Sequence, residues 1–213
     1  MAEIYFFDLD RTLVKANITK KFFISFFLDH RSEFLKKAFF NSPLILDYVL
    51  HPEELDTAHK LIVEMICDEY DSVKKFSDKF IFDIFSKELF MPVYEDLKTA
   101  FHCGKRVVIL SAAPNFIIDP ISKSLGIKEA YGSVYEKDEN KSLKLKSVLS
   151  GREKASIALN IMQKANVEKK NVTVYSDSFQ DLELLCLAGV PVAVNPDKKL
   201  ERIAKEENWR IIR

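Results

Sequence analysis

The chain has 213 residues, of which 47% are hydrophobic, and its 32 Lys and Arg balance 32 Asp and Glu. This hydrophobic fraction excludes a disordered chain, and the zero net charge excludes general attraction to a nucleic-acid backbone. Cys67, Cys103 and Cys186 are too far apart for a disulfide framework, which favours a reducing compartment.

Neither a secretory signal nor a membrane span is expected. Acidic residues begin at Glu3, too early for a signal peptide. The longest uncharged stretch, 184–196, is short and contains Gly and Pro. We therefore expect a soluble cytoplasmic protein. No Cys or His pair has zinc-type spacing, so His51 and His59 are expected at the surface.

Short apolar runs predict the strands of a buried parallel sheet. They lack polar alternation, as strands covered on both faces do, and comprise residues 4–7, 107–110, 172–176 and 190–194. Helical stretches lie between or after them, over 93–103, 114–125, 153–165, 179–188 and 197–207. This alternation predicts an α/β fold with a Rossmann-like, doubly wound parallel sheet.

Residues 14–92 have a different character, since they contain stripes of Phe at helical spacing. We expect three or four amphipathic helices here, forming a helical cap (14–92) inserted into an α/β core (1–13 and 93–213). The stripes include Phe22, Phe23, Phe26, Phe27, Phe34, Leu35, Ala38 and Phe39. Two interpretations stay open. The Phe side chains form the core of the cap, or some line a pocket for an apolar or lipid-like group, with Lys15, Lys20 and Lys21 near anionic head groups.

Each apolar run ends in a polar residue. Asp8, Ser111 and Asp177 follow three of the runs directly, and Asp10 lies two positions after Asp8. Because ligands bind outside the carboxyl ends of parallel strands, these side chains should converge at one edge of the sheet. The alternatives are structural: the Asp pair could cap a helix, Ser111 could cap a helix before Pro114, and Lys154 could be a solvated helix residue.

The same residues resemble the four motifs of the haloacid dehalogenase (HAD) superfamily. FFDLDRTL at 6–13 resembles the first motif and LSAAP at 110–114 the second. Lys154 in GREKA resembles the third motif, and YSDSFQDLELL at 175–185 the fourth. The tail after residue 193 resembles subfamily IB, the phosphoserine-phosphatase-like branch. The resemblance covers 1–13 and 93–213, whereas 14–92 matches only in position and helical character.

The resemblance implies a phosphohydrolase that cleaves a phosphate monoester. Asp8 would be the nucleophile that forms an aspartyl-phosphate, and Asp10 would be the general acid and then base, which requires a raised pKa. Ser111 and the backbone N–H of Ala112 would bind the phosphoryl oxygens, and Lys154 would neutralise their charge.

The resemblance also implies bound Mg²⁺. Asp8 and Asp177 would hold it through carboxylates and Asp10 through its backbone carbonyl, while Asp181 would orient Lys154 or a metal-bound water. Charge supports this, because up to four carboxylates and a phosphate would face one lysine. Thr12 and Ser178 would hold the loop geometry.

The substrate stays open. Asn17 stands where phosphoserine phosphatases usually carry a Glu. Ala112, Ala113, Ser176 and Ser178 stand where they carry Gly, which also argues against phosphoserine. The alternatives are a phosphatidylglycerophosphate-type lipid phosphatase, a phosphotransferase or mutase, or a non-catalytic HAD-fold binding module. A 2-haloacid dehalogenase is disfavoured, since that chemistry does not use an Asp at position 10. We expect no nucleic-acid partner, and membrane contact only with a lipid substrate; the oligomeric state and the role of Arg11 stay open.

Overall fold

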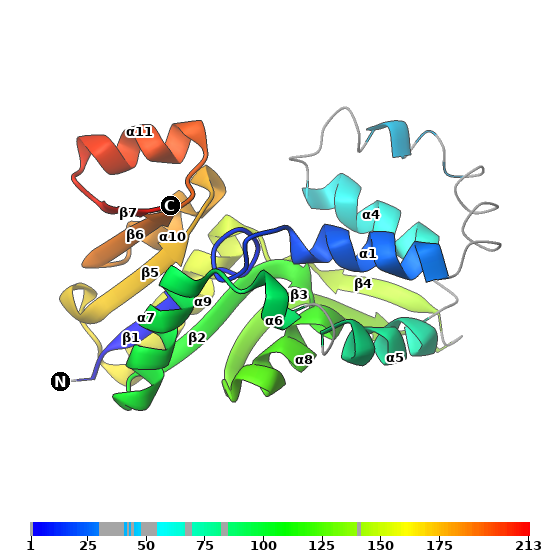
Figure 1. The fold of residues 1–213 in the computed structure, drawn as a ribbon, viewed down its shortest axis with the longest axis horizontal. Coiled ribbons are helices and arrows are strands. Elements are labelled where there is room, and N and C mark those ends of the chain that lie inside the picture. Colours follow the sequence, from blue (N-terminus) through cyan, green and yellow to red (C-terminus); the bar gives the residue numbers. More distant parts are fainter. Residues whose placement is uncertain are drawn as a thin grey trace.

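The structure is a computed structural model that describes residues 2–29, 41, 43, 45–47, 55–66, 70–81, 85–139 and 142–213. Within these ranges the chain forms a seven-stranded sheet in the order β4-β3-β2-β1-β5-β6-β7 (Figure 1). Only β4 is antiparallel to its neighbour among these described strands. The strands are β1 (Ile4–Phe7), β2 (Arg106–Pro114), β3 (Glu129–Lys137), β4 (Leu143–Ser147), β5 (Val172–Ser176), β6 (Val190–Val194) and β7 (Arg210–Ile212). The predicted α/β fold is confirmed.

Helices cover both faces of the sheet, which makes it doubly wound. The face toward Phe7 and Ile109 packs against α7 (Met91–His102) and α8 (Asn115–Leu125). The face toward Phe6 and Val108 packs against α9 (Gly151–Ala165), α10 (Leu182–Leu185) and α11 (Lys198–Glu206). Short 3-10 turns, η2 (Lys169–Asn171) and η3 (Phe179–Asp181), precede β5 and α10. β1 and residues 107–110 of β2 are covered on both faces, which explains why these predicted runs are apolar throughout.

The helices that follow β1 lie at the β3–β4 end of the molecule, away from α11 (Figure 1). They are α1 (Ile18–Asp29), α4 (Leu55–Ile66) and α5 (Tyr70–Phe80), while the short α6 (Ser86–Glu88) lies nearer the middle of the view. Phe22 of α1 lies at the centre of their packing, with ring centroids 5.2 Å from Phe80 and 5.9 Å from Phe116 of α8. The described Phe side chains thus form a shared aromatic core, while Phe34, Leu35, Ala38 and Phe39 lie outside the described residues.

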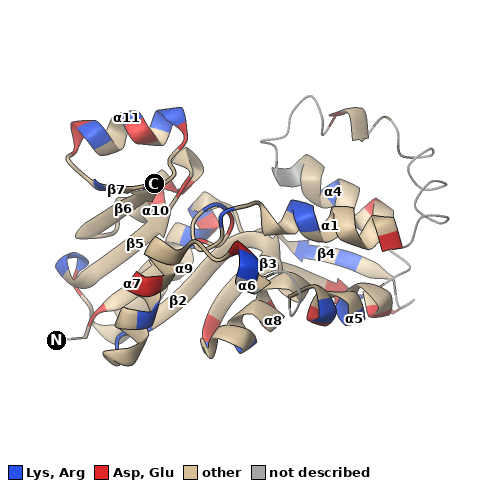
Figure 2. Cartoon of the chain, viewed as in Figure 1, with Lys and Arg blue, Asp and Glu red and all other residues tan. Residues whose placement is uncertain are grey.

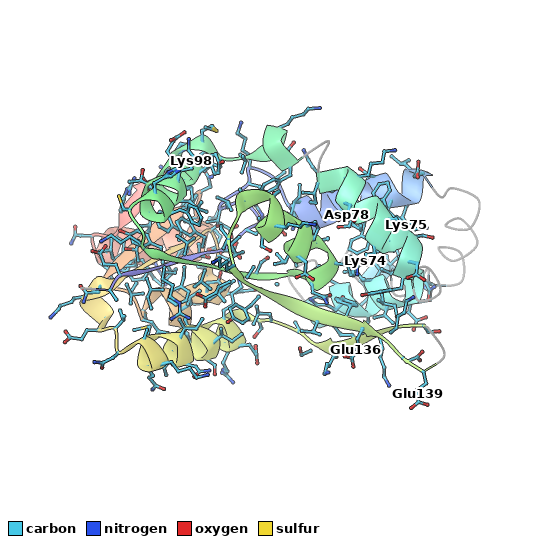
Figure 3. The ribbon with its side chains drawn as sticks, turned by 90° about the horizontal axis from the view of Figure 1, so that it is seen from below. Lys74, Lys75, Asp78, Lys98, Glu136 and Glu139 are labelled. Atoms are coloured by element: carbon cyan, nitrogen blue, oxygen red, sulfur yellow. The ribbon has the colours of Figure 1, made fainter. Side chains whose placement is uncertain are left out.

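Helix α5 shows how the apolar stripe positions an inserted helix. Val73, Ser77 and Phe80 are buried, and Lys74, Lys75 and Asp78 are exposed on its other side (Figure 3). Spacings of four and three residues between buried positions are typical of an amphipathic helix. Lys and Arg mix with Asp and Glu along α5 and α11 (Figure 2), so neither helix carries a face of one sign.

Three strands were not expected from the sequence: β3, β4 and β7. β3 and β4 pair with each other at one edge of the sheet, and most of their positions are half-buried or exposed, so charged residues interrupt their apolar pattern. β7 has three residues. β2 also runs further than expected, to Pro114, with a shifted register against β3 between Leu110 and Pro114. Among the described residues, no helix is both long and apolar enough for a membrane span.

Candidate active site

The carboxyl ends of β1, β2 and β5 bring the predicted polar residues together. β1 lies between the other two strands, and its ladder continues past the strand end where the Asp8 N–H donates to the carbonyl of Tyr175 at 3.0 Å. Asp8 and Asp177 therefore directly follow β1 and β5, and Ser111 lies within the neighbouring β2, although the three residues are far apart in sequence. All three are buried.

Lys154, from the first turns of α9, joins this group as a buried cation. Its Nζ lies 2.7 Å from Asp8 Oδ1 and 2.9 Å from Asp181 Oδ2. The Asp181 carboxylate also accepts a hydrogen bond from Ser176 Oγ at 2.7 Å. Lys154 is only 4% exposed, so the interpretation as a solvated helix lysine is wrong.

The ionisation of this cluster follows from burial and from like charges. Burial raises the pKa of Asp8, and Lys154 opposes this without cancelling it. Burial pulls the pKa of Lys154 down, but the carboxylates of Asp181 and Asp8 outweigh it, and the pKa stands above its usual value. Lys154 therefore stays cationic between two carboxylates.

Asp10 lies at the N-terminus of α1. One carboxylate oxygen accepts the Ile18 N–H at 2.6 Å and the other accepts the Thr19 hydroxyl at 3.0 Å. The alternative reading of Asp10 as a helix-capping carboxylate thus describes a real contact, which any catalytic role would share. Burial and the nearby Asp8 raise the pKa of Asp10 to about 6. Asn17 caps the same helix, since its Oδ1 accepts the Lys20 N–H at 2.7 Å.

The chain crosses between core and inserted helices at two adjacent segments. The Lys15 N–H donates to the Glu88 carbonyl at 2.8 Å, and the Phe90 N–H donates to the Leu13 carbonyl at 2.9 Å. Lys21, one of the lysines considered for binding an anionic head group, forms an ion pair with Glu88 at 2.6 Å. Its charge is therefore already paired with a carboxylate. The two backbone hydrogen bonds hold the segment between Asp10 and α1 against residues 88–90.

Asp177 closes the site on the β5 side. Burial and the nearby Asp8 raise its pKa to about 8, and Arg11 works against this rise. The Arg11 Nε lies 3.6 Å from Asp177 Oδ2, and Arg11 adopts a left-handed backbone with φ of 60°. The fourth-motif loop is braced by Asp197, whose N–H donates to the Asp177 carbonyl at 2.9 Å.

Ser111 does not cap a helix. β2 continues through it to Pro114, and α8 begins at Asn115 without a side-chain cap. Its Oγ instead accepts the Ala113 N–H at 3.1 Å. The carbonyl of Ala112, in the same peptide unit, accepts the Ser133 hydroxyl at 2.7 Å. This peptide is therefore held at both ends.

A model of the haloacid dehalogenase-like hydrolase family matches residues 5–185. The chain belongs to this family. The predicted resemblance is therefore confirmed, and the matched range includes Asp8, Ser111, Lys154 and Asp177.

Similar proteins carry phosphatase names. Phosphoserine phosphatase SerB1 of Mycobacterium tuberculosis is 32% identical over 110 residues, which are 51% of this chain and 36% of that protein. Probable phosphatase Rv3661 of the same organism is 26% identical over 97% of this chain and 74% of that protein. A solved phosphoserine phosphatase in apo form has a TM-score of 0.68 at 16% identity, covering 100% of this chain and 94% of the other, which shows the shared fold. The chain thus matches about a third of SerB1's length.

The HAD-like site has donors that suit a hard divalent cation. Asp8 and Asp177 contribute buried carboxyl groups, and burial is the main cause that raises the pKa of each. A bound cation would favour their ionised forms. Within the described residues, no cluster of three or more His, Cys, Asp or Glu side chains could hold a metal ion. The expected Mg²⁺ ligands do not require such a cluster, because only two of them, Asp8 and Asp177, are side chains. The third is the backbone carbonyl of Asp10. The oxygen-only donor set fits Mg²⁺.

Thr12 and Ser178, which the resemblance assigned to the geometry of the two loops, differ in their contacts. Thr12 is fully buried, and its Oγ1 has no hydrogen-bond partner among the described residues. Ser178 Oγ accepts the Gln180 N–H at 3.2 Å and so caps η3, which leads to Asp181.

The prediction that His59 lies at the surface is wrong, while His51 lies outside the described residues. His59 is 3% exposed, and its ring contacts Tyr135 and Ser133 of β3. Its sequence position held a signal, since Ile62 and Ile66 follow at helical spacing and are buried on α4. A histidine on the apolar face of a helix can be buried when polar partners lie opposite it. The partners of His59 lie on β3, a strand that was not predicted from the sequence.

Proposed function

We propose that this chain is a Mg²⁺-dependent phosphatase that hydrolyses a phosphate monoester through an aspartyl-phosphate on Asp8. The observation that carries this proposal is the buried contact of Lys154 with both Asp8 and Asp181. A lysine here balances the charge of a nucleophilic carboxylate and of the phosphoryl group that it attacks. The phosphatase names of the relatives agree with this chemistry.

Asp10 is proposed as the general acid and base. A raised pKa of about 6 lets its carboxyl hold a proton near neutral pH and donate it to the departing alkoxide. Once the leaving group is gone, the carboxylate can take a proton from the water that attacks the phosphoaspartate. Its contacts with Ile18 and Thr19 hold it in a fixed orientation.

Asp8, Asp177 and the Asp10 carbonyl are proposed to hold Mg²⁺. The bound ion supplies charge neutralisation to the phosphoryl oxygens. Ser111 Oγ and the Ala112 N–H hold the phosphoryl group, Asp181 keeps Lys154 oriented toward Asp8, and Thr12 and Ser178 support the two loops. These assignments rest on the match between motif positions and the geometry of the site.

We propose residues 14–92 as the cap and residues 1–13 with 93–213 as the core. Two paired linkers connect them, and Asp10 contacts the first inserted helix directly. A cap positioned in this way can exclude water from the site while the leaving group departs. Asn17 is engaged as a helix cap, and its neutral amide offers no charge for a substrate ammonium, so we do not propose phosphoserine.

The test is release of inorganic phosphate from amino-acid, sugar, nucleotide and lysolipid monoesters, in Mg²⁺ and in EDTA. We expect turnover in Mg²⁺ with at least one class and none in EDTA. The Asp8→Asn variant serves as the inactive control for contaminating phosphatase. Absence of metal-dependent turnover across the panel, from protein with a cooperative unfolding transition, would contradict the proposal.

A further inference from the structure

A buried polar cluster connects inserted helix α4 to the second motif. It consists of His59 on α4 with Ser133 and Tyr135 on β3, and each of these side chains is at most 3% exposed. His59 Nε2 lies 3.3 Å from Ser133 Oγ, and His59 Nδ1 contacts the Tyr135 hydroxyl. The described contacts around Asp8 and Asp177 do not involve this cluster, so its role is separate from theirs.

Ser133 is the centre of the cluster, because three segments meet at its hydroxyl. Ser133 Oγ donates to the Ala112 carbonyl at 2.7 Å and accepts the Leu149 N–H at 3.0 Å. Leu149 comes two residues before α9, the helix that carries Lys154. One hydroxyl thus contacts the second motif, the entry to the lysine helix and the inserted helix α4.

Hydrogen-bond accounting fixes the direction of these contacts. A serine hydroxyl has one proton, and the Ala112 carbonyl, which can only accept, takes it. Nε2 of His59 must therefore carry the proton in its contact with Ser133. Burial raises the pKa of Tyr135, which keeps the phenol protonated and able to donate to Nδ1 of His59. A proton on Nε2 and an accepting Nδ1 satisfy both of these contacts of His59.

The contacts continue from Ser133 to the predicted phosphate ligand. The Ala112 carbonyl and the Ala113 N–H belong to one planar peptide unit, so Ser133 sets the orientation of both. The Ala113 N–H takes one acceptor position of Ser111 Oγ at 3.1 Å. With that position occupied, the directions open to the Ser111 hydroxyl proton are restricted.

We propose that His59 and Ser133 are positioning residues that couple helix α4 to the orientation of the Ser111 hydroxyl. This proposal rests on the proposed function, in which Ser111 donates to a phosphoryl oxygen. Fixed donors stabilise developing charge without reorganising during the reaction, so the loss of orientation should lower kcat more than it changes KM. The position of α4 would then influence chemistry that occurs on the core.

The chain offers a matched control. Ser77 of α5 is also buried, and its hydroxyl also joins an inserted helix to the core, through the Phe116 carbonyl on α8. Phe116 lies outside the Ala112–Ala113 peptide. Ser77→Ala therefore removes a buried serine hydroxyl of the same kind without touching the proposed connection.

The experiment compares Ser133→Ala, His59→Leu, His59→Gln and Ser77→Ala, with kcat and KM for p-nitrophenyl phosphate and amide exchange at Ala113 by NMR. We expect Ser133→Ala and His59→Leu to lower kcat about ten-fold with KM changed less than about two-fold. Exchange at Ala113 should rise in both variants. His59→Gln keeps an N–H donor and should recover most of kcat, and Ser77→Ala should leave both readouts unchanged.

Equal kcat and equal Ala113 exchange in Ser133→Ala, His59→Leu and Ser77→Ala would overturn the proposal, and so would failure of His59→Gln to recover more than His59→Leu. If Ser133→Ala does not fold, the His59 pair and Tyr135→Phe decide between the outcomes. If the wild-type protein releases no phosphate, the proposed function fails. The Ala113 exchange then still shows whether His59 and Ser133 hold the peptide.

Discussion

The amino group of Lys154 lies 2.7 Å from Asp8 Oδ1, although the two residues are 146 positions apart in the chain. A second carboxylate, that of Asp181, lies 2.9 Å from the same amino group. All three side chains are almost fully buried. One cation between two carboxyl groups leaves an excess of acidic groups at this point, which agrees with the proposal that a further cation binds here.

Lys154→Met should destabilise the protein and abolish phosphate release. Removing one member of a buried ion pair leaves the other charge unpaired, and such changes cost about 3–5 kcal/mol. The exposed Lys75 of α5 provides the control, since Lys75→Met removes the same charge from a solvated position. Urea unfolding at neutral pH measures both variants. Equal unfolding midpoints would show that the buried pair does not stabilise the fold.

Asp8→Asn should remove activity while leaving the fold intact. An amide cannot attack phosphorus as a carboxylate does, and loss of a catalytic nucleophile lowers rates by at least about a thousand-fold. The Asn side chain has nearly the same shape, and Lys154 keeps Asp181 as a partner. Asp78→Asn, on the exposed side of α5, is the matched control. Residual turnover of Asp8→Asn near the wild-type rate would remove Asp8 from the nucleophile role.

Two Asp10 variants should separate chemistry from capping. Asp10→Asn can still accept the Ile18 N–H, so we expect little loss of stability. Its rate should fall more for alkyl phosphates than for p-nitrophenyl phosphate, because only poor leaving groups need the general acid. Asp10→Ala also loses the helix contact, which costs about 1 kcal/mol in addition. A rate loss of equal size for both leaving groups would contradict the acid role.

The core strands and the polar residues at their carboxyl ends could be predicted from the sequence, because both depend on local patterns. IYFF and VPVAV are short apolar runs, VTVYS contains no charged residue, and the residues that follow β1 and β5 are Asp8 and Asp177. Convergence of these residues follows from the parallel arrangement of the strands alone. The position of Lys154 required the family motif, since a helical lysine carries no local signal of burial.

Other features could not be predicted, because they depend on contacts between residues that are far apart in the sequence. β3 lies next to β4 and carries a polar, half-exposed pattern, so the partners of His59 could not be located. Asn115 illustrates the same point. Its side-chain amide exchanges two hydrogen bonds with the backbone of Tyr135 at 3.1 Å each, which extends the β2–β3 contact beyond the last strand pair, Pro114 with Ser133. Only the folded sheet brings these groups within reach.

In EDTA the protein should lose stability as the pH rises. Burial and Asp8 raise the pKa of Asp10 to about 6 and that of Asp177 to about 8, whereas an unfolded Asp titrates at about 3.9. Between these values the folded state binds more protons, so the free energy of unfolding falls as the pH rises.

Thermal unfolding in EDTA from about pH 5 to pH 8.5 measures this slope, and Asp177→Asn should flatten its upper part. Mg²⁺ should raise Tm more at the alkaline end, because metal binding requires ionised carboxylates. A Tm in EDTA that rises with pH, or a Mg²⁺ effect that survives unchanged in Asp177→Asn, would contradict this account.

Gly151→Ala should separate the lysine helix from the fourth motif. A Cβ at position 151 would lie 1.8 Å from the Gln180 carbonyl oxygen, so α9 and η3 would have to move apart. Overpacking of this kind costs about 1–3 kcal/mol, and the shift should also weaken the Lys154–Asp181 contact and lower kcat.

Gly104→Ala is the control for the glycine change itself. A Cβ added at position 104 would meet no atom within 4 Å. The φ of +68° makes the substitution unfavourable through backbone strain alone, which costs about 1–2 kcal/mol. Both variants should therefore unfold at lower urea, while only Gly151→Ala should lose turnover. Full activity in a destabilised Gly151→Ala protein would show that Lys154 reaches Asp8 without the close contact between α9 and η3.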